Sequence, residues 1–428
     1  ALQMAVDTSA LDGFFKVRYA DKMENLVPAF AKVAKIIPFK TGEKTGSTYQ
    51  FPVRLRRSMG ITWAGGADYG TAFALNSPVS GVLKNATLTG TEFVLTEYLS
   101  YGAISKATSN IEAFGSAFDE TVSDMATAAA FAREMALLYG GGSIGTIASV
   151  TNPNATTCVA IISAATWAPG LWVQMEGALL DGYNGSTKQN DSTATAAYTV
   201  TNVNTDTRAV TVTGEATDIT ALGAADVLIP YGAYGKWFAG IDTITANTGS
   251  LFGIDAATYG LWKSSTYAAG GVALTMAKIT AAAAKVTTKG GMRDLTAFVS
   301  TFTWSDLNSD LAALKRVTSS VKGGIDQGTE GEDGNITYYG PNGSIKICPH
   351  PMVKAGEAFL IDPRTWKRIG SSDVTFGLPG SPPGQQPNFF GELPSNAGVS
   401  LRCYWDQSLI NSKPASACKI TGITNTAS

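Results

Sequence analysis

Few residues in this chain could support catalysis or metal binding, because it holds a single histidine, His350, and four cysteines. Cys348 and His350 lie two residues apart in a strand-like stretch, so both side chains could share one face. They could form a thiolate pair or, with Cys403 and Cys418, half of a metal site. Zinc sites usually show tightly spaced ligand pairs, and none occurs here. We therefore interpret both residues as buried in a strand, and we expect no disulfides.

Two further patterns could bind a ligand. Residues 140–145 are glycine-rich like a phosphate-binding loop, but they follow a helical pattern and lack a Lys before Ser or Thr, which favours a helix end. An acidic group could hold calcium but lacks the alternating ligands of an EF-hand loop, which favours a solvated loop; its members are Asp326, Glu330, Glu332 and Asp333. We predict that the chain is not an enzyme and binds no cofactor or metal.

The composition indicates a protein that hides much of its surface. Charged residues make up 15% of the 428 residues, against roughly 25% in an average soluble protein. The hydrophobic share is 44% and the net charge is −2, so the deficit falls on the surface and predicts contact with other subunits. The thinly spread cations argue against a dedicated nucleic-acid binder. No apolar run is long enough to cross a bilayer and the first ten residues lack a signal-peptide pattern, which predicts a cytosolic chain.

The first part of the chain reads as an extended arm followed by a long hairpin. Residues 48–56 alternate with period two, and Pro52 restricts this strand to a sheet edge. We expect it to pair with the Thr-rich residues 86–95, and the Gly-rich tip at 60–81 to lie on a neighbouring subunit because it has too few large apolar residues to fold alone. The arginines of the strand could meet carboxylates of that neighbour or face water. The expected inter-subunit residues are Arg54, Arg56, Arg57, Trp63, Tyr69 and Phe73.

A long helix is predicted over residues 109–139. Ser109 and Glu112 form a capping-box pattern at its start, and Gly140 begins the glycine run at its end. An apolar stripe recurs every three or four residues. The expected core of this helix is Phe114, Phe118, Val122 and Met125.

The remainder divides into a β-rich insert and an α/β layer. Residues 151–235 are rich in Thr, Ala, Asn and Gly, and their best hairpin pairs 198–203 with 208–213. Helices are predicted at 274–286 and 304–317, with a strand at 295–302 between them. Later strands are predicted at 345–348, 358–361, 399–404 and 418–423.

The order of these elements resembles the major capsid proteins of tailed bacteriophages, which have the Hong Kong 97 fold, over essentially the whole chain. Two stretches are similar to the segment by which such subunits enter their axial domain: Gly240-Ile-Asp-Thr-Ile, and Thr248-Gly-Ser-Leu-Phe-Gly-Ile-Asp with Leu261-Trp-Lys. The ending resembles their last peripheral strands: Leu401-Arg-Cys-Tyr-Trp, Asn411-Ser-Lys-Pro-Ala-Ser-Ala and Lys419-Ile-Thr-Gly-Ile.

This resemblance implies an α+β subunit with six parts. They are an N-terminal arm (1–44), an extended hairpin or E-loop (45–107), a spine helix with peripheral domain (108–150), a β-rich insertion domain (151–236), an axial domain (237–400) and C-terminal peripheral strands (401–428). Insertion domains support folding or neighbour contacts in some relatives. No residue matches a crosslinking motif.

The resemblance also implies a role and partners. The chain is expected to self-assemble in the host cytoplasm into hexamers and pentamers of an icosahedral virion shell that encloses double-stranded DNA without sequence specificity. Scaffolding, portal and decoration proteins are expected partners, with a separate scaffolding protein preferred, and no membrane is involved. The alternatives are a tail tube or other virion component and, from another class, a secreted β-rich enzyme acting on polysaccharide.

Overall fold

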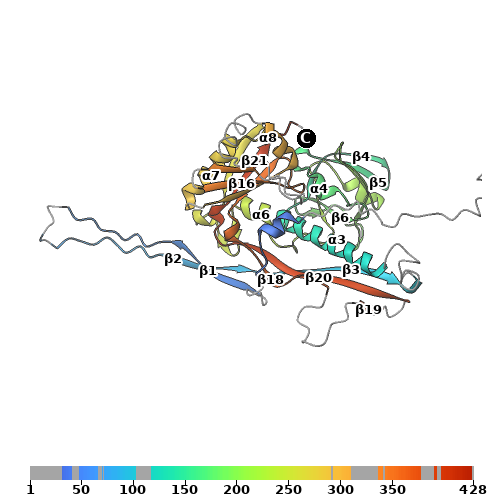
Figure 1. Cartoon of the computed structure of the whole chain (residues 1–428), viewed down its shortest axis with the longest axis horizontal. Coiled ribbons are helices and arrows are strands. Elements are labelled where there is room, and N and C mark those ends of the chain that lie inside the picture. The colour runs from blue at the N-terminus through green and yellow to red at the C-terminus, as the bar shows by residue number, and fades with distance from the viewer. Residues whose placement is uncertain are drawn as a thin grey trace, which may run out of the picture.

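The protein is an α+β body from which one long, narrow arm projects (Figure 1). The computed structural model describes residues 31–40, 48–65, 70, 72–102, 117–290, 293–309, 336–340, 343–376, 390–392 and 397–426. In these ranges the body contains three larger sheets, a short two-stranded sheet and the long helix α3, and the arm is a two-stranded ribbon. None of the helices in these ranges combines the length and apolarity that a membrane span requires.

The arm consists of β1 (Tyr49–Arg56) and β2 (Val82–Leu88), which pair antiparallel. The strand predicted at 48–56 is confirmed, and Pro52 lies in a ribbon that has no third strand among the described residues. The predicted partner at 86–95 is wrong in part, because it breaks at Thr89 and Gly90 and the chain then enters β3 (Thr91–Ser100) in another sheet. The pattern of alternation continues through both strands and does not mark where the partner changes.

A peripheral sheet is built around β20 (Gly398–Asn411), which pairs with β3 along one side and with β18 (Trp366–Thr375) and β19 (Phe390–Glu392) in addition. Helix α3 (Ala117–Tyr139) packs on this sheet, where Met125 and Ala129 contact Leu401 and Cys403. Both α3 residues are buried because the helical stripe brings them to the same face. The sheet thus supports α3 along its length (Figure 1).

The predicted helix at 109–139 is confirmed where it is described. Of its expected core residues, Met125 is 2% exposed and Val122 is half-buried. Ser109, Glu112 and Phe114, and the side chain of Phe118, lie outside the described residues. The helix ends where the glycine run predicts, with Gly141 at φ +73°, a conformation that favours glycine.

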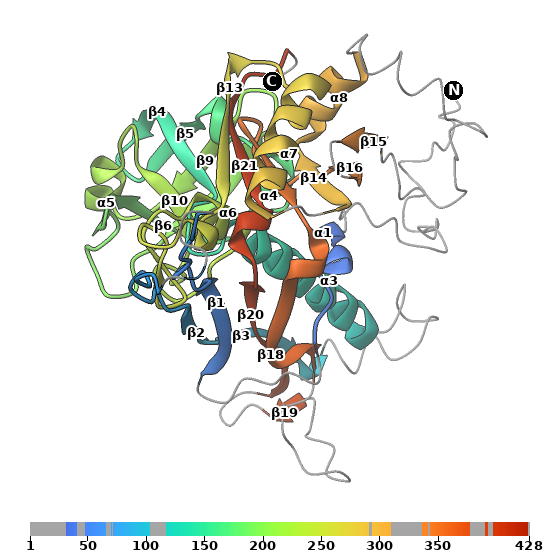
Figure 2. The same cartoon turned by 90° about the vertical axis from the view of Figure 1, so that its left-hand side faces the viewer.

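A six-stranded sheet forms the second layer, in the order β13 (Ser265–Val272), β21 (Cys418–Ile423), β17 (Glu357–Ile361), β14 (Leu295–Val299), β16 (Gly343–Pro349) and β15 (Ile336–Gly340). One face packs on α7 (Met276–Gly290) and α8 (Thr301–Ser309), with Ile279 and Val286 of α7 buried against Leu360 and Ile420. The other face meets the end of α3, where Tyr139 contacts Phe359 edge-on at 6.2 Å between ring centroids. Figure 2 shows this layer beside the peripheral sheet.

Two predicted elements of this layer begin or end elsewhere. The strand expected at 295–302 ends at Val299, and α8 begins at Thr301 instead of Trp304. The Ser300 hydroxyl accepts a hydrogen bond from the Thr303 backbone N–H at 3.1 Å, so Ser300 caps the helix. Residues 310–317 of the predicted second helix lie outside the described residues.

The third sheet is a small barrel. Its strands follow the order β10 (Val227–Pro230), β4 (Gly145–Asn154), β5 (Thr157–Ile162), β9 (Ala209–Thr213), β8 (Tyr198–Asn204) and β6 (Leu179–Asn184), and β6 pairs back to β10 while β7 (Thr187–Lys188) extends β6. This closure removes the sheet edges around a core that includes Tyr198 and Val212. The predicted hairpin at 198–203 and 208–213 is confirmed.

The insert expected at 151–236 differs from this barrel in two respects. The barrel begins at Gly145, because β4 starts directly after the glycines that end α3. It is not all-β, since it carries α4 (Pro169–Trp172) and α5 (Ala216–Ala221).

The strands of the segment expected at 401–428 lie in two different sheets. The last strand, β21, does not join β20 but lies inside the six-stranded sheet between β13 and β17, while β18, assigned to the axial domain, pairs with β20. The strands β20 and β21 follow each other in the sequence, and the turn around η6 (Pro414–Ser416) leads the chain from one sheet to the other. Smaller elements complete the body: α6 (Ile241–Ala246), β11 (Ser250–Leu251), β12 (Ile254–Asp255), η3 (Ala164–Thr166), η4 (Gly260–Trp262) and η5 (Pro363–Thr365).

A buried carboxylate ties the first described helix, α1 (Lys32–Ile36), to the body. Glu134 of α3 is fully buried and accepts hydrogen bonds from the backbone N–H groups of Val33 and Ala34. It also accepts from His350 Nε2 at 2.9 Å. Because His350 Nδ1 accepts the Met352 N–H at 3.0 Å, the ring proton sits on Nε2, and the histidine is a neutral donor. One side chain thus satisfies three buried donors.

Two glycines permit α3 and α6 to cross at backbone contact. The Gly240 N–H donates to the Gly140 carbonyl at 2.8 Å. A Cβ at Gly240 would lie 2.6 Å from the Gly140 nitrogen and 2.8 Å from the Ala136 carbonyl oxygen. Both distances are shorter than any tolerated contact, so no side chain fits at this crossing.

We predict that Glu134→Ala lowers the free energy of unfolding by roughly 3 kcal/mol or more, because three buried donors lose their acceptor at about 1–3 kcal/mol each. Urea unfolding of the unassembled subunit measures this. Glu134→Gln, which keeps one acceptor oxygen, should lose less. Glu176→Ala, at an exposed position on the barrel, is the matched control and should change little. Equal stability of the Glu134 and Glu176 variants would contradict the role of Glu134.

We further predict that Gly240→Ala costs roughly 3 kcal/mol, in the upper range for overpacking, because backbone atoms cannot move out of the way. Gly249→Ala is the control, since a Cβ there meets nothing within 4 Å. It should change the free energy of unfolding by less than about 0.5 kcal/mol. Thermal and urea unfolding compare the two, and similar values for both variants would rule out a steric constraint at the crossing.

Candidate assembly interface

The outer part of the arm exposes large apolar side chains that no described residue of the same chain covers. Trp63 is 88% exposed and Leu75 is 79% exposed. Hydrogen bonds join the two sides of the ribbon there, including Met59 N–H to the Val79 carbonyl at 3.0 Å and Asn76 Nδ2 to the Ile61 carbonyl at 2.9 Å. Apolar surface of this kind on a projecting element is typical of a protein–protein interface.

The root of the arm, in contrast, packs firmly on the body. Phe51 lies 6.2 Å from Trp262 between ring centroids, and Leu88 is buried with Ile369 and Ile410. The Thr87 N–H donates to the Phe252 carbonyl at 2.9 Å. The arm therefore leaves the body in a defined direction, although its outer part has no core.

The expected inter-subunit residues all lie along this arm where they are described. Arg54, Arg56 and Arg57 are exposed near the root, and Arg56 Nη2 donates to the Ser80 carbonyl at 3.3 Å. Trp63 and Phe73 are exposed farther out. The structure spreads these residues along the ribbon and does not gather them into one site. Tyr69 lies outside the described residues.

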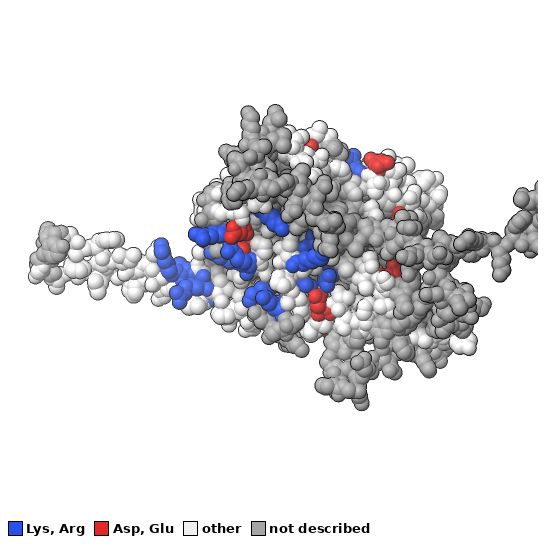
Figure 3. Space-filling view, viewed as in Figure 1, with Lys and Arg blue, Asp and Glu red and all other residues white. Residues whose placement is uncertain are grey.

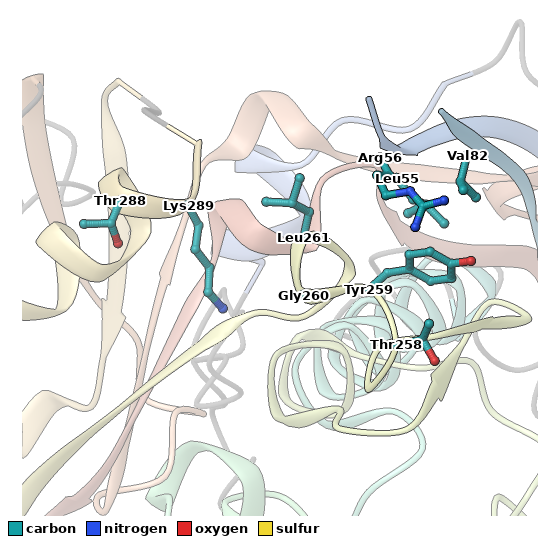
Figure 4. Close-up of a pocket in the computed structure, with 9 residues that line it drawn as sticks. All are labelled: Leu55, Arg56, Val82, Thr258, Tyr259, Gly260, Leu261, Thr288 and Lys289. Atoms are coloured by element: carbon teal, nitrogen blue, oxygen red, sulfur yellow. The ribbon is translucent and has the colours of Figure 1, made fainter. Parts of the chain in front are cut away.

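A pocket of about 550 Å³ lies where the arm meets the body (Figure 4). We call it the root pocket; its lining residues are Leu55, Arg56, Val82, Thr258, Tyr259, Gly260, Leu261, Thr288 and Lys289. Lys84 of the arm stands over the Tyr259 ring, 5.2 Å from its centroid. Blue side chains gather around the root of the arm in Figure 3, which shows the basic character of this region. The motif Leu261-Trp-Lys, quoted above for its resemblance to capsid proteins, contributes Leu261 to the root pocket, but no sequence pattern indicated a pocket here.

The four cysteines and the single histidine are all buried. Cys348 is buried in β16, and His350 is committed to Glu134 and Met352. Cys403 lies in β20 and Cys418 in β21, in different sheets. Burial raises the pKa of the Cys418 thiol to about 12, so it stays protonated at neutral pH. No group of three potential metal ligands occurs within the described ranges.

A second buried ionic cluster, not recognised in the sequence, joins α6 to the six-stranded sheet. Lys419 contacts Asp242, and its Nζ lies 2.8 Å from Glu357 Oε1. Lys354 Nζ donates to the Ser143 carbonyl at 2.8 Å and stands 4.1 Å from the centroid of the Tyr139 ring. Burial raises the pKa of Glu357 and lowers that of Lys354, but two cations offset two carboxylates. Equal numbers of buried positive and negative charges are typical of an ionic cluster that stabilises a fold.

Two sequence motifs remain, the glycine run and the acidic group. The glycines from Gly140 end α3 and lead into β4, as the helix-end interpretation predicted. The acidic residues Asp326, Glu330, Glu332 and Asp333 lie outside the described residues. The features that stand out are therefore surfaces for contact between proteins: the arm and its root pocket.

Comparisons with known proteins agree with this geometry. A family model described as the SU10 major capsid protein matches residues 104–369, more than half of the chain. No curated protein matches the sequence. Among solved structures, the chain is similar to the capsid asymmetric unit of cyanophage A-1(L), with a TM-score of 0.53 at 12% identity over 98% of this chain and 99% of that one.

It is also similar to the capsid of the native GTA particle, with a TM-score of 0.50 at 9% identity over 99% of this chain and 100% of that one. At these identities the likeness establishes the fold, and the family match carries the capsid-forming role. The alternatives of a tail tube and a secreted enzyme have no such support. The chain therefore belongs to the SU10 major capsid protein family, and it is a capsid-forming structural protein with the Hong Kong 97 fold.

Proposed function

We propose that this subunit closes an icosahedral phage shell by laying its arm across a neighbouring subunit, in both hexamers and pentamers. The observation that carries the proposal is the exposure of Trp63 and Leu75 on an element that extends away from its own body. Each large apolar side chain gains roughly 1.5–3 kcal/mol when it is removed from water. A second copy of the chain is the partner that every subunit of a shell meets.

The division between a rigid root and a coreless outer part suits this role. The root fixes the direction of the arm through Phe51, Leu88 and their contacts, while the outer ribbon can follow the different angles of hexamers and pentamers. Many modest contacts then add up, because a subunit in a closed shell engages several neighbours at once.

The same proposal extends to the parts of the assembly that meet the subunit. Residues 1–30 would reach beneath an adjacent subunit, with α1 held by Glu134 as their anchor. In this proposal the six-stranded sheet belongs to the axial domain, and the barrel is the insertion domain. Assembly in the host cytoplasm, a separate scaffolding protein, a portal, decoration proteins and enclosed double-stranded DNA complete this proposal.

Electron microscopy of the purified chain, expressed alone and with its scaffolding protein and fractionated by sedimentation, tests the proposal. Shells, or free hexamers and pentamers, are the expected products. Tubes in both preparations would overturn the icosahedral arrangement, and a monomer in both would overturn self-assembly altogether.

We predict that Ile61→Lys/Trp63→Lys abolishes shell formation while leaving the melting temperature of the unassembled subunit unchanged. Both side chains are exposed in the single subunit, Ile61 at 56%, so the substitutions remove only contacts made with another copy. Leu179→Lys, at a 46% exposed apolar position on the barrel, controls for added charge and should leave the shell yield intact. Wild-type yields from the arm variant would show that the arm does not carry the contact.

A further inference from the structure

We propose that the root pocket binds the acidic residues 326–333 of a neighbouring copy, and that this contact joins subunits edge to edge into rings. The inference rests on the proposed self-assembly and names a specific pair of surfaces within it. It concerns the body and the root of the arm, and is independent of where the tip of the arm lies.

The root pocket is built to receive negative charge. Arg56 and Lys289 line it from opposite sides, from β1 and α7, and no acidic residue is among its lining residues (Figure 4). Lys84 lies at its rim over Tyr259. A carboxylate in the pocket could therefore reach cations on both the arm and the body.

These cations lack carboxylate partners in the described part of the subunit. Lys289 Nζ donates to the carbonyls of Lys263 and Ser264 at 3.1 and 3.4 Å, and neither contact neutralises its charge. Burial lowers the pKa of Lys289, and the nearby Lys263 and Lys285 lower it further. An anion in the pocket would oppose both effects, because an opposite charge favours the ammonium form.

Among the described residues, Asp255 interacts with Lys84, but it makes its hydrogen bonds to its own turn. Asp255 accepts hydrogen bonds from the Thr258 hydroxyl and the Ala257 N–H at 2.9 Å, which lower its pKa, and Lys84 contributes only a smaller lowering. Asp255 forms no ion pair with a described Lys or Arg. The pocket therefore keeps a positive charge that a partner can satisfy.

Residues 326–333 are the complementary part of the same chain. Four of these eight residues are carboxylates, Asp326, Glu330, Glu332 and Asp333, and no Lys or Arg occurs between 323 and 345. A chain with a net charge of only −2 thus separates a basic root from an acidic segment. Complementary patches of this kind set the register of an interface.

The strand that follows the acidic segment in the sequence and the strand beside the root pocket are the two edge strands of the six-stranded sheet. The acidic segment leads into β15, which is one edge strand, while Lys263 and Ser264, which Lys289 contacts, lead into β13, the other edge strand (Figure 2). Six strands separate these edges by roughly 24 Å. A contact between unlike edges is heterologous, and when its rotation closes it generates a ring, as capsomers require.

Reciprocal charge reversal in the full-length chain tests the pairing. The pocket variant is Arg56→Glu/Lys289→Glu, the segment variant is Glu330→Lys/Glu332→Lys, and the third protein combines both. Shell yield is measured by sedimentation and electron microscopy, and melting of the unassembled subunit controls for folding. We expect each one-sided variant to lose about ten-fold or more in yield, because like charges then face each other, and the combined variant to recover.

The outcomes separate the two levels of the proposal. Wild-type yield from the pocket variant, or failure of the combined variant to recover, would overturn the pairing while leaving self-assembly established by the wild-type shells. If the wild type itself forms no shells, the proposed function fails, and the pairing is decided by direct binding instead.

For that measurement, a synthetic peptide of residues 324–335 is titrated into the unassembled full-length subunit by calorimetry. A matched peptide with Asn and Gln at the four acidic positions is the control. Binding of the acidic peptide that weakens with salt and is lost in the Arg56→Glu/Lys289→Glu variant supports the pairing. Equal behaviour of the two peptides, or no binding by either, overturns it.

Discussion

The last two turns of α3 are the constraint on which the rest of the body depends. Glu134 holds α1 and His350, Arg133 pairs with Asp373 of β18 at 3.0 Å, and Tyr139 packs on Phe359 and accepts the Lys354 N–H. One residue later the backbone crosses α6 at contact distance. The peripheral sheet and the six-stranded sheet thus both contact one short stretch of helix. Because the carboxylate of Glu134 is buried, its loss would leave the donors of α1 and His350 without this acceptor.

This concentration of buried polar contacts explains why body and arm behave as different kinds of structure. The body is held together by polar contacts that are buried away from water, such as those of Glu134 and Lys419. The arm has a root packed on the body, whereas its described outer part exposes Trp63 and Leu75, so under the proposed function the outer part can adapt to a partner. A shell subunit needs both properties, because the same chain must occupy environments that differ in angle.

Much of this architecture could be predicted from the sequence where one local pattern decides the outcome. The alternation at 48–56, the glycines after Tyr139 and the hairpin at 198–213 each specify their structure through nearby residues. The errors arose where the partner is remote. Nothing local tells that β3 leaves the arm for β20, that β6 pairs back to β10 to close a barrel, or that Lys419 lies beside Asp242. Glu134 was missed for the same reason, because a glutamate within a helix usually faces water and its three partners come from elsewhere in the chain.

The fold shows where the few charged residues of the chain lie. Several of the few charged residues are buried, among them Glu134, Asp181, Lys354, Arg368 and Lys419. The chain as a whole is 15% charged, and the arm exposes the large apolar side chains of Trp63 and Leu75. Such a subunit gains little from remaining alone in water, and each neighbour that it meets covers apolar surface and supplies charge. Under the proposed function, assembly buries apolar side chains that the single chain exposes to water.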